Sequence, residues 1–220
     1  MLKRMYHWFL HKTSKPDEKG EVSAGYWQDK IRETVFGLCQ ACKGNLLEVG
    51  CGEGLFLQKF TAQGGATTGF VGLDLSSKQL QRAKIRTAGS VCLLQADAIA
   101  LPFKENSFET IVCINVFINM PREDLVDVAW KELQRVCKEE GRVLFEIRNK
   151  LNPLIRAKYK LAKYYDATID SSRLRLFSPS AFEAKIKKMG FEVTRRLRIG
   201  FPRGRFAPVI IMEAVRRKKL

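Results

Sequence analysis

Apolar and polar positions divide most of the chain into short apolar runs that alternate with segments of helical spacing. Apolar runs of strand length are found at 45–49, at 70–74, at 91–95, at 108–115 and at 142–147. Helical spacing is found at 26–42, at 55–63, at 76–86 and after Pro121. Strands that alternate with helices indicate a parallel sheet with right-handed crossovers and helices on both faces.

The helix after Pro121 is predicted to bury one apolar face and to end at Gly141. That face is predicted to consist of Leu125, Val128, Ala129, Leu133 and Val136.

The rhythm changes in the last forty or so residues. Ser178 is placed to cap a helix over 179–189, and Gly190 to close it. Two strands follow, at 191–199 and 208–215, and the short loop between them favours antiparallel pairing. We therefore expect an α/β fold with a mainly parallel seven-stranded sheet, a C-terminal antiparallel hairpin and helices on both faces.

A glycine turn joins the first strand to its helix. Gly50, Gly52 and Gly54 follow the apolar run that ends at Val49, and helical spacing begins at Leu55. Glycine lets the backbone approach a ligand closely because it has no Cβ. The start of the next helix also offers unpaired N–H groups, so this turn is a candidate ligand site.

Acidic residues follow the next two strands. Asp74 lies 24 residues past Gly50, at the end of an apolar strand, where a carboxylate can accept hydrogen bonds from two ribose hydroxyls. Asp97 follows the third strand and is placed to accept a hydrogen bond from an adenine amine. The three parts together indicate a nucleoside-containing ligand.

These segments resemble a known family. Glu-Val-Gly-Cys-Gly-Glu-Gly, Gly-Leu-Asp-Leu-Ser and Gln-Ala-Asp-Ala-Ile-Ala-Leu-Pro-Phe, in this order, are similar to motifs of class I S-adenosylmethionine-dependent methyltransferases. The branch that methylates quinones and other small metabolites is the most similar, and the resemblance is good over residues 45–147. It implies the Rossmann-like class I methyltransferase fold and S-adenosylmethionine as cofactor. The cofactor-binding residues that it implies are Glu48, Gly50, Cys51, Gly52, Gly54, Asp74, Leu75, Asp97, Ala98 and Asn115.

The main alternative for these motifs is an NAD(P) dehydrogenase. Its glycine fingerprint is G-x-G-x-x-G, whereas this chain has G-x-G-x-G and Leu55 in place of the third glycine. Glu48 favours the methyltransferase, because in that family an acid at this position helps to hold the methionine end of the cofactor. A tight turn with no ligand is the remaining interpretation.

The residues at the end of the fourth strand narrow the class of methyl acceptor that is expected. Methyltransferases that act on base amines typically carry Asn/Asp-Pro-Pro-Tyr/Phe there, and cytosine C5 enzymes carry a Cys after Pro. This chain has neither, since Cys113 follows Val112. Both nucleic-acid chemistries are therefore disfavoured, and Phe117 is expected to face the substrate.

Positive charge is concentrated in the last third. Residues 1–147 carry 19 Lys and Arg against 18 Asp and Glu, whereas residues 148–220 carry 20 against 5. Such a surface favours an anionic small-molecule substrate, an anionic membrane surface or nucleic acid, of which the last is the weaker expectation. The alternative interpretation, a solvated basic surface that binds no partner, is left open.

The chain is predicted to form one domain over 26–220, preceded by a flexible arm over 1–25. Residues 148–177 are too long for a simple connection and are interpreted as a substrate cap. No apolar run reaches the length of a membrane span, and no secretory signal is recognised, so a cytoplasmic or peripheral-membrane location is expected. The lone Cys39-x-x-Cys42 pair is interpreted as neither a zinc site nor a redox centre, and no metal is expected.

No catalytic base is evident. Both histidines, His7 and His11, lie in the arm, and methyl transfer needs a base only when the nucleophile must lose a proton. The weak catalytic candidates are Tyr26, His11, Tyr164, Tyr165 and Asp166. Three hypotheses follow: a methyltransferase for an acidic or amphiphilic metabolite, an RNA methyltransferase that uses the basic third, and a non-catalytic cofactor-binding subunit.

Overall fold

The computed structural model describes residues 26–40, 42, 44–63, 69–157, 160 and 175–218, without the side chains of Tyr26 and Trp27. The predicted arm over 1–25 and most of the predicted cap over 148–177 lie outside the described residues.

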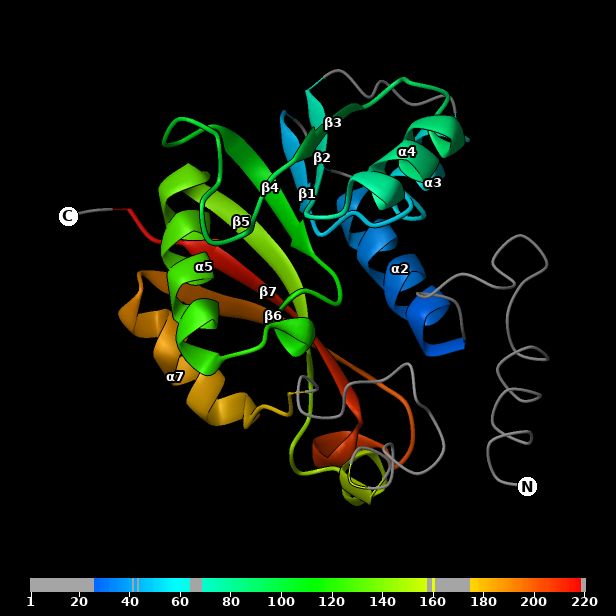
Figure 1. Cartoon of the computed structure of the whole chain (residues 1–220). Coiled ribbons are helices and arrows are strands. Elements are labelled where there is room, and N and C mark those ends of the chain that lie inside the picture. The colour runs from blue at the N-terminus through cyan, green and yellow to red at the C-terminus, as the bar shows by residue number, and fades with distance from the viewer. Residues whose placement is uncertain are drawn as a thin grey trace.

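A seven-stranded sheet forms the centre of the described part of the chain, in the order β3-β2-β1-β4-β5-β7-β6 (Figure 1). Neighbouring strands from β3 to β5 run parallel, and β7 pairs antiparallel with both β5 and β6. This confirms the predicted sheet and hairpin. The strands are β1 (Leu46–Val49), β2 (Phe70–Asp74), β3 (Cys92–Gln95), β4 (Phe108–Cys113), β5 (Cys137–Arg148), β6 (Phe191–Ile199) and β7 (Val209–Arg216).

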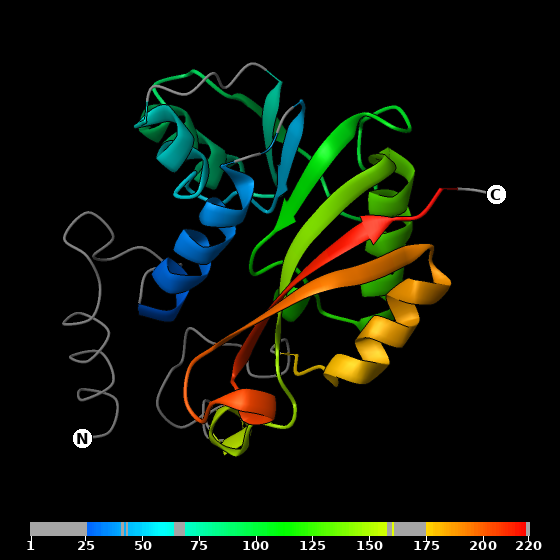
Figure 2. The ribbon, with the colours of Figure 1, turned by 180° about the vertical axis from the view of Figure 1, so that it is seen from behind.

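Helices cover both faces of the sheet. In Figures 1 and 2, α2 (Tyr26–Cys39), α3 (Leu57–Thr61) and α4 (Ser77–Arg86) lie on one side, and α5 (Glu123–Val136) and α7 (Pro179–Lys188) on the other. Two short 3-10 turns, η2 (Phe117–Asn119) and η3 (Gly204–Phe206), lie in the connections. None of the described helices is long and apolar enough to cross a membrane.

The core on the side of α5 and α7 is rich in aromatic rings. Trp130 of α5 is fully buried and stacks on Phe117 with ring centroids 5.5 Å apart. Phe145 of β5 meets both rings edge-on. The expectation that Phe117 faces the substrate is therefore wrong: its side chain is fully buried, because η2 turns it into this aromatic cluster.

The buried face of α5 differs from the prediction, and Leu125 is only half-buried. Val128 is 39% exposed, whereas Val126 and Trp130 are fully buried beside Ala129, Leu133 and Val136. The sequence pattern counted Val128 as core because it is apolar, but Trp130 is the larger residue and occupies the centre of the interface.

Two predicted boundaries also change. Helix α5 ends at Val136 and β5 begins at once, so Gly141 lies within β5 and does not end the helix. A Cβ at Gly141 would meet the carbonyl oxygen of Lys138 at 2.8 Å, so close packing explains this glycine. The predicted cap at Ser76 is confirmed, since its hydroxyl accepts the Gln79 N–H, but Ser178 makes no such bond.

Candidate functional site

A cavity of about 530 Å³ opens at the carboxyl ends of β1, β2 and β4. Ligands of open parallel sheets bind at this edge, because the loops after the strands converge there. Nine of the ten predicted cofactor-binding residues line the cavity. They are Glu48, Gly50, Cys51, Gly52, Asp74, Leu75, Asp97, Ala98 and Asn115.

The glycine turn is fixed to the end of β2 by its own backbone. The N–H groups of Gly50 and Cys51 donate to the carbonyl oxygen of Leu73, at 2.7 and 2.9 Å. The N–H of Gly52 donates to Oδ2 of Asp74 at 2.8 Å. The turn therefore keeps a fixed shape at the cavity wall.

These bonds count against the dehydrogenase interpretation. A dinucleotide pyrophosphate is held by unpaired N–H groups of the glycine turn and the helix that follows it. Here the N–H groups of Gly50, Cys51 and Gly52 already donate within the protein, and so does that of Gly54. The helix that follows, α3, has only five residues. The glycine turn thus offers room for a ligand, but it offers few free N–H groups that could bind an anion.

Gly52 and Gly54 have different roles. Both have positive φ values, +52° and +78°, but a Cβ on Gly52 would meet nothing within 4 Å. A Cβ on Gly54 would lie 3.0 Å from the Cβ of Ala83 in α4. Gly52 is therefore the residue that keeps the cavity open, and Gly54, predicted as cofactor-binding, does not line the cavity and allows α4 to pack closely.

The two predicted nucleoside acids occupy one side of the cavity. Asp74 is half-buried, and its Oδ1 accepts the Ser76 N–H at 2.9 Å while Oδ2 accepts from Gly52. Each carboxylate oxygen has a second lone pair, so Asp74 can still accept from a ligand. Asp97 is half-buried, and its Oδ1 accepts the Ile99 N–H at 3.2 Å.

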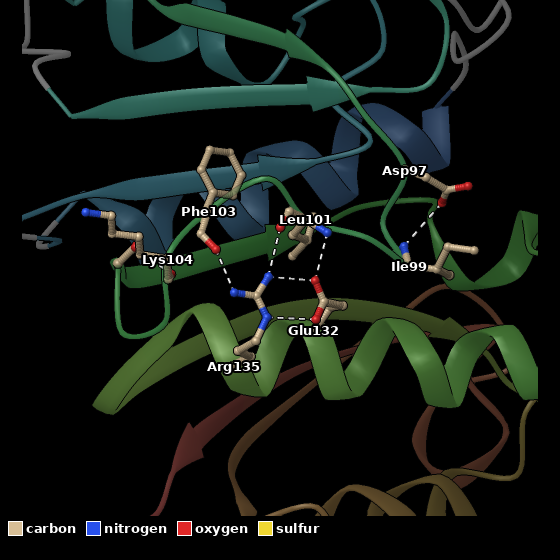
Figure 3. A network of polar contacts seen from close by, with 8 residues as sticks. Asp97, Ile99, Leu101, Phe103, Lys104, Glu132 and Arg135 are labelled. Carbon is tan, nitrogen blue, oxygen red and sulfur yellow. Dashed lines mark hydrogen bonds and ion pairs between the residues drawn. The ribbon is translucent and has the colours of Figure 1, made fainter.

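The loop that carries Asp97 is held by helix α5, as Figure 3 shows. Glu132 accepts the Leu101 N–H at 2.8 Å. Arg135 donates to the carbonyl oxygens of Leu101 and Phe103, at 2.8 and 2.6 Å, and its Nε donates to Glu132. We name this pair the Glu132–Arg135 clamp. Sequence reasoning missed it, because it joins side chains that lie some thirty residues from the loop.

A buried acid and a buried cation lie at the other side of the cavity. Glu48 is 3% exposed and its Oε2 accepts no hydrogen bond from the described residues. Arg32 of α2 is 4% exposed, and it also lines the cavity. Burial raises the pKa of Glu48 well above its ordinary value of 4.5, and Asp74 adds to this, while the positive charge of Arg32 opposes it. Sequence reasoning predicted Glu48 but not Arg32.

Asn115 belongs to a polar network between β4, β5 and α2. Its Nδ2 donates to Gln28 at 2.8 Å, and its Oδ1 accepts from Arg148 at 3.1 Å. Its backbone N–H donates to Glu146, which is 1% exposed and pairs with Arg148 at 2.8 Å. Because Glu146 and Arg148 pair with each other, neither buried charge is left without a partner. The amide of Asn115 is thus held in place at the cavity rim.

The weak catalytic candidates are not placed by the structure. His11, Tyr164, Tyr165 and Asp166 lie outside the described residues, and so does the side chain of Tyr26. Within the described ranges no group of three or more His, Cys, Asp and Glu could hold a metal ion.

Comparison with known proteins agrees with this geometry. The Methyltransferase domain family matches residues 47–145, from β1 to β5. Over residues 47–145 the chain is therefore similar to known methyltransferase domains, and its fold is that of the class I methyltransferases.

Two curated relatives contain the same domain. A malonyl-[acyl-carrier protein] O-methyltransferase from Erwinia pyrifoliae is 38% identical over 103 residues, which are 46% of this chain and 36% of that protein. A demethylmenaquinone methyltransferase from Staphylococcus aureus is 31% identical over 138 residues, 61% of this chain and 55% of the relative. The chain thus matches about half of these relatives' length or less.

Solved methyltransferases share the fold over nearly the whole chain. A magnesium protoporphyrin IX methyltransferase from Synechocystis, solved with bound SAH, has a TM-score of 0.67 at 19% identity and covers 97% of this chain and 94% of its own. A possible histamine N-methyltransferase from Thermotoga maritima has a TM-score of 0.64 at 20% identity, covering 97% and 92%.

S-adenosylmethionine is the cofactor that the sequence motifs imply, and the Synechocystis enzyme of the same fold was solved with bound SAH. The residues present fit it. Gly52 leaves open the space that any Cβ would fill, and Glu48 presents a buried oxygen that has no donor among the described residues. An ammonium group is the kind of partner that such an oxygen needs.

Proposed function

We propose that this chain transfers a methyl group from S-adenosylmethionine to a small, acidic or amphiphilic acceptor. The observation that carries the proposal is the arrangement of charges in one cavity. Glu48 of β1 and Arg32 of α2, one acid and one cation, line the cavity together with the carboxylates of Asp74 and Asp97 at the ends of β2 and β3. This pattern suits an amino acid joined to a nucleoside, which is the chemistry of the cofactor.

Each residue has a role in this proposal. Glu48 accepts hydrogen bonds from the ammonium group, and Arg32 pairs with the carboxylate of the methionine end. Asp74 accepts from the ribose hydroxyls, and Asp97 accepts from the adenine amine. The cofactor supplies an activated methyl group on a sulfonium, so the protein's part is to position it and to exclude water.

The remaining wall of the cavity supports a small acceptor. Asn119, Met120, Pro121 and Leu125 line the part that is not assigned to the cofactor. One exposed amide beside apolar side chains suits a molecule that is partly polar and partly apolar.

A surface near the same edge of the sheet supports an amphiphilic acceptor at a membrane. Four of the large hydrophobic side chains that are exposed among the described residues lie on two neighbouring segments: Leu151, Leu154, Phe201 and Phe206. Asn149 and Asn152 join the segments, donating to the carbonyl oxygens of Arg205 and Phe206. Figure 2 shows the helical turn at 153–157 beside η3.

Basic residues surround these apolar side chains. Arg156, Arg203 and Arg205 are all exposed on the same two segments. Exposed apolar side chains within a basic surface are typical of proteins that dock on anionic lipid. We propose that this surface, defined as residues 150–156 and 201–206, places the chain on an anionic membrane where a lipid-soluble acceptor resides.

The membrane part is tested by sedimentation with vesicles. The full chain is expected to bind phosphatidylglycerol vesicles and to lose most of this binding on replacement of both Arg203 and Arg205 by Gln. Lys187→Gln with Lys188→Gln is the matched control, because it removes two exposed positive charges of the same basic third from α7. Equal binding by both double variants would show that only net charge matters.

The catalytic part is tested independently. The purified chain, radiolabelled S-adenosylmethionine and a fractionated host extract are combined, and the label is followed. Label in the organic-soluble or low-mass fraction supports the proposal. Label that nuclease removes would indicate RNA methylation by the basic third, and no transfer to any fraction by a chain that binds the cofactor would indicate a non-catalytic subunit.

A further inference from the structure

The Cys39-x-x-Cys42 pair lies at the edge of the sheet opposite the cavity. Cys39 is the last residue of α2, and Cys42 contacts Thr110 of β4 and Arg142 of β5. Its two thiols take no part in the cofactor site, and the sequence alone indicated no role for them.

The local backbone brings the two cysteines together. The Cys42 N–H donates to the carbonyl oxygen of Cys39 at 2.9 Å, which closes one turn of the 3-10 type. In such a turn the side chains of residues i and i+3 lie on the same side. Cys39 is 1% exposed, whereas Cys42 is partly accessible. One thiol is thus open to a small reagent, and the other lies directly behind it.

Arg142 places a positive charge on the accessible thiol. Its Nη2 contacts the Sγ of Cys42 at 2.6 Å and also donates to the carbonyl oxygen of Leu38. Its Nη1 donates to Glu213 at 2.9 Å, which fixes the guanidinium from the other side. The Thr110 hydroxyl donates to the same sulfur at 3.5 Å.

These donors are needed because of where the pair lies. The C-terminal end of a helix carries partial negative charge, which disfavours a thiolate. The neighbouring groups reverse this: hydrogen bonds from the Cys39 thiol and Thr110, together with Arg142, lower the pKa of Cys42 to about 6 against the opposing effect of burial. The hydrogen bond with Cys42 and burial raise the pKa of Cys39. The two thiols therefore differ in the way that an attacking and a resolving cysteine differ.

We propose that Cys42 and Cys39 form a thiol–disulfide exchange site, with Cys42 as the attacking thiolate, Cys39 as the resolving thiol and Arg142 as the residue that stabilises the thiolate. The Cys42 thiolate attacks one sulfur of a low-molecular-mass disulfide, forms a mixed disulfide and releases one thiolate. The Cys39 thiol then gives its proton to solvent and attacks the Cys42 sulfur. This forms the Cys39–Cys42 disulfide and releases the second thiolate. Two electrons pass from the cysteine pair to the small disulfide, which is reduced to two thiols.

The test uses glutathione disulfide and the full chain, with the exposed Cys92 replaced by Ser. After incubation the remaining thiols are alkylated and the peptides are analysed by mass spectrometry. This chain is expected to end with a Cys39–Cys42 disulfide and no attached glutathione. With Cys39→Ser added, the reaction is expected to stop with one glutathione on Cys42, because the resolving thiol is missing. Absence of both products at these positions would overturn the proposal.

The role of Arg142 is tested by the rate of the first step. Arg142→Met in the Cys39→Ser background is expected to slow attachment of glutathione about tenfold at slightly acidic pH. Arg195→Met is the matched control, because Arg195 also pairs with Glu213, at 3.5 Å, and is exposed. Equal rates for the two variants, each with a native circular dichroism spectrum, would contradict the assignment of Arg142. If Arg142→Met does not fold, Thr110→Val tests the same sulfur by removing its other donor.

Discussion

Asp74 holds Gly52 in place at the cavity wall, through a hydrogen bond of 2.8 Å from the Gly52 N–H to Oδ2. The carboxylate at the end of β2 therefore supports the glycine turn that follows β1, while it remains able to accept from a ligand. In the proposed site Asp74 both supports the glycine turn and accepts from the ribose, so its loss is expected to have a local structural effect and a direct effect on binding.

Replacement of Asp74 separates these effects. Asp74→Ala is expected to weaken S-adenosylmethionine binding by about 1–3 kcal/mol, because it removes a charged acceptor. Asp74→Asn keeps one oxygen for the Gly52 N–H and is expected to weaken binding less. Isothermal titration calorimetry measures both, and normal binding by Asp74→Ala would show that the ribose lies elsewhere.

The two glycines are expected to fail in different ways. Gly52→Val fills the open cavity and is expected to abolish cofactor binding, with a cost of about 1 kcal/mol from its positive φ. Gly54→Val is expected to lower the melting temperature more strongly, because its Cβ meets Ala83. Thermal unfolding and calorimetry on both variants check this. The reverse pattern would contradict the assignment of the two positions.

Cofactor affinity is expected to rise with pH as Glu48 loses its proton, at a pH above that at which an ordinary carboxyl ionises. The pKa of Glu48 is raised above 4.5, so Glu48 is protonated at a pH where an ordinary carboxyl is ionised. An ammonium group binds the ionised form, and binding must therefore release the Glu48 proton below that pKa. Arg32 and Asp74 are the charged groups that act on Glu48, and they have opposite effects.

Titration calorimetry at several pH values measures this dependence. Glu48→Gln is the matched control, because it has the same shape and no proton to lose. Its affinity is expected to be lower and nearly independent of pH over the same range. A variant that keeps the pH dependence of the natural chain would exclude Glu48 as its source.

The Glu132–Arg135 clamp is expected to hold the Asp97 loop. Arg135→Met removes the donors to Leu101 and Phe103 and is expected to cost about 1–2 kcal/mol of stability and to weaken cofactor binding several-fold. Lys131→Met, on the exposed side of the same helix, is expected to change neither quantity. Chemical denaturation and calorimetry would distinguish the two variants.

Alkylation of Cys42 by iodoacetamide is expected to have a midpoint near pH 6, because its pKa is lowered to about 6. Below that pH the rate is expected to fall about tenfold per unit, since only the thiolate reacts. At pH 6 the rate is expected to exceed that of a cysteine in an unstructured peptide about tenfold, after allowance for the weaker nucleophilicity of a low-pKa thiolate. A midpoint near the peptide value would contradict the effect of Arg142.

Local pattern alone was enough to predict much of the fold. The seven strands alternate or pair as expected, because burial on one or both faces of a sheet leaves a direct trace in the order of apolar residues. The Ser76 cap and the acid that ends β2 were likewise readable, since each depends only on neighbours in the chain. The predicted helix end at Gly141 was wrong, because packing decides this position. The glycine is needed there for close contact with the backbone of Lys138.

By itself the sequence predicted the loops that line the cavity, and nine of the ten residues predicted to bind a cofactor lie in its wall. Only the tertiary structure decided which side chains from distant parts of the chain contact the cavity, its loops and Cys42. Arg32 reaches the cavity from α2, Arg135 holds the Asp97 loop from α5, and Arg142 reaches Cys42 from β5. The physical reason is that charge pairing and hydrogen bonding act through space, so residues that lie far apart in the chain leave no periodic pattern to read.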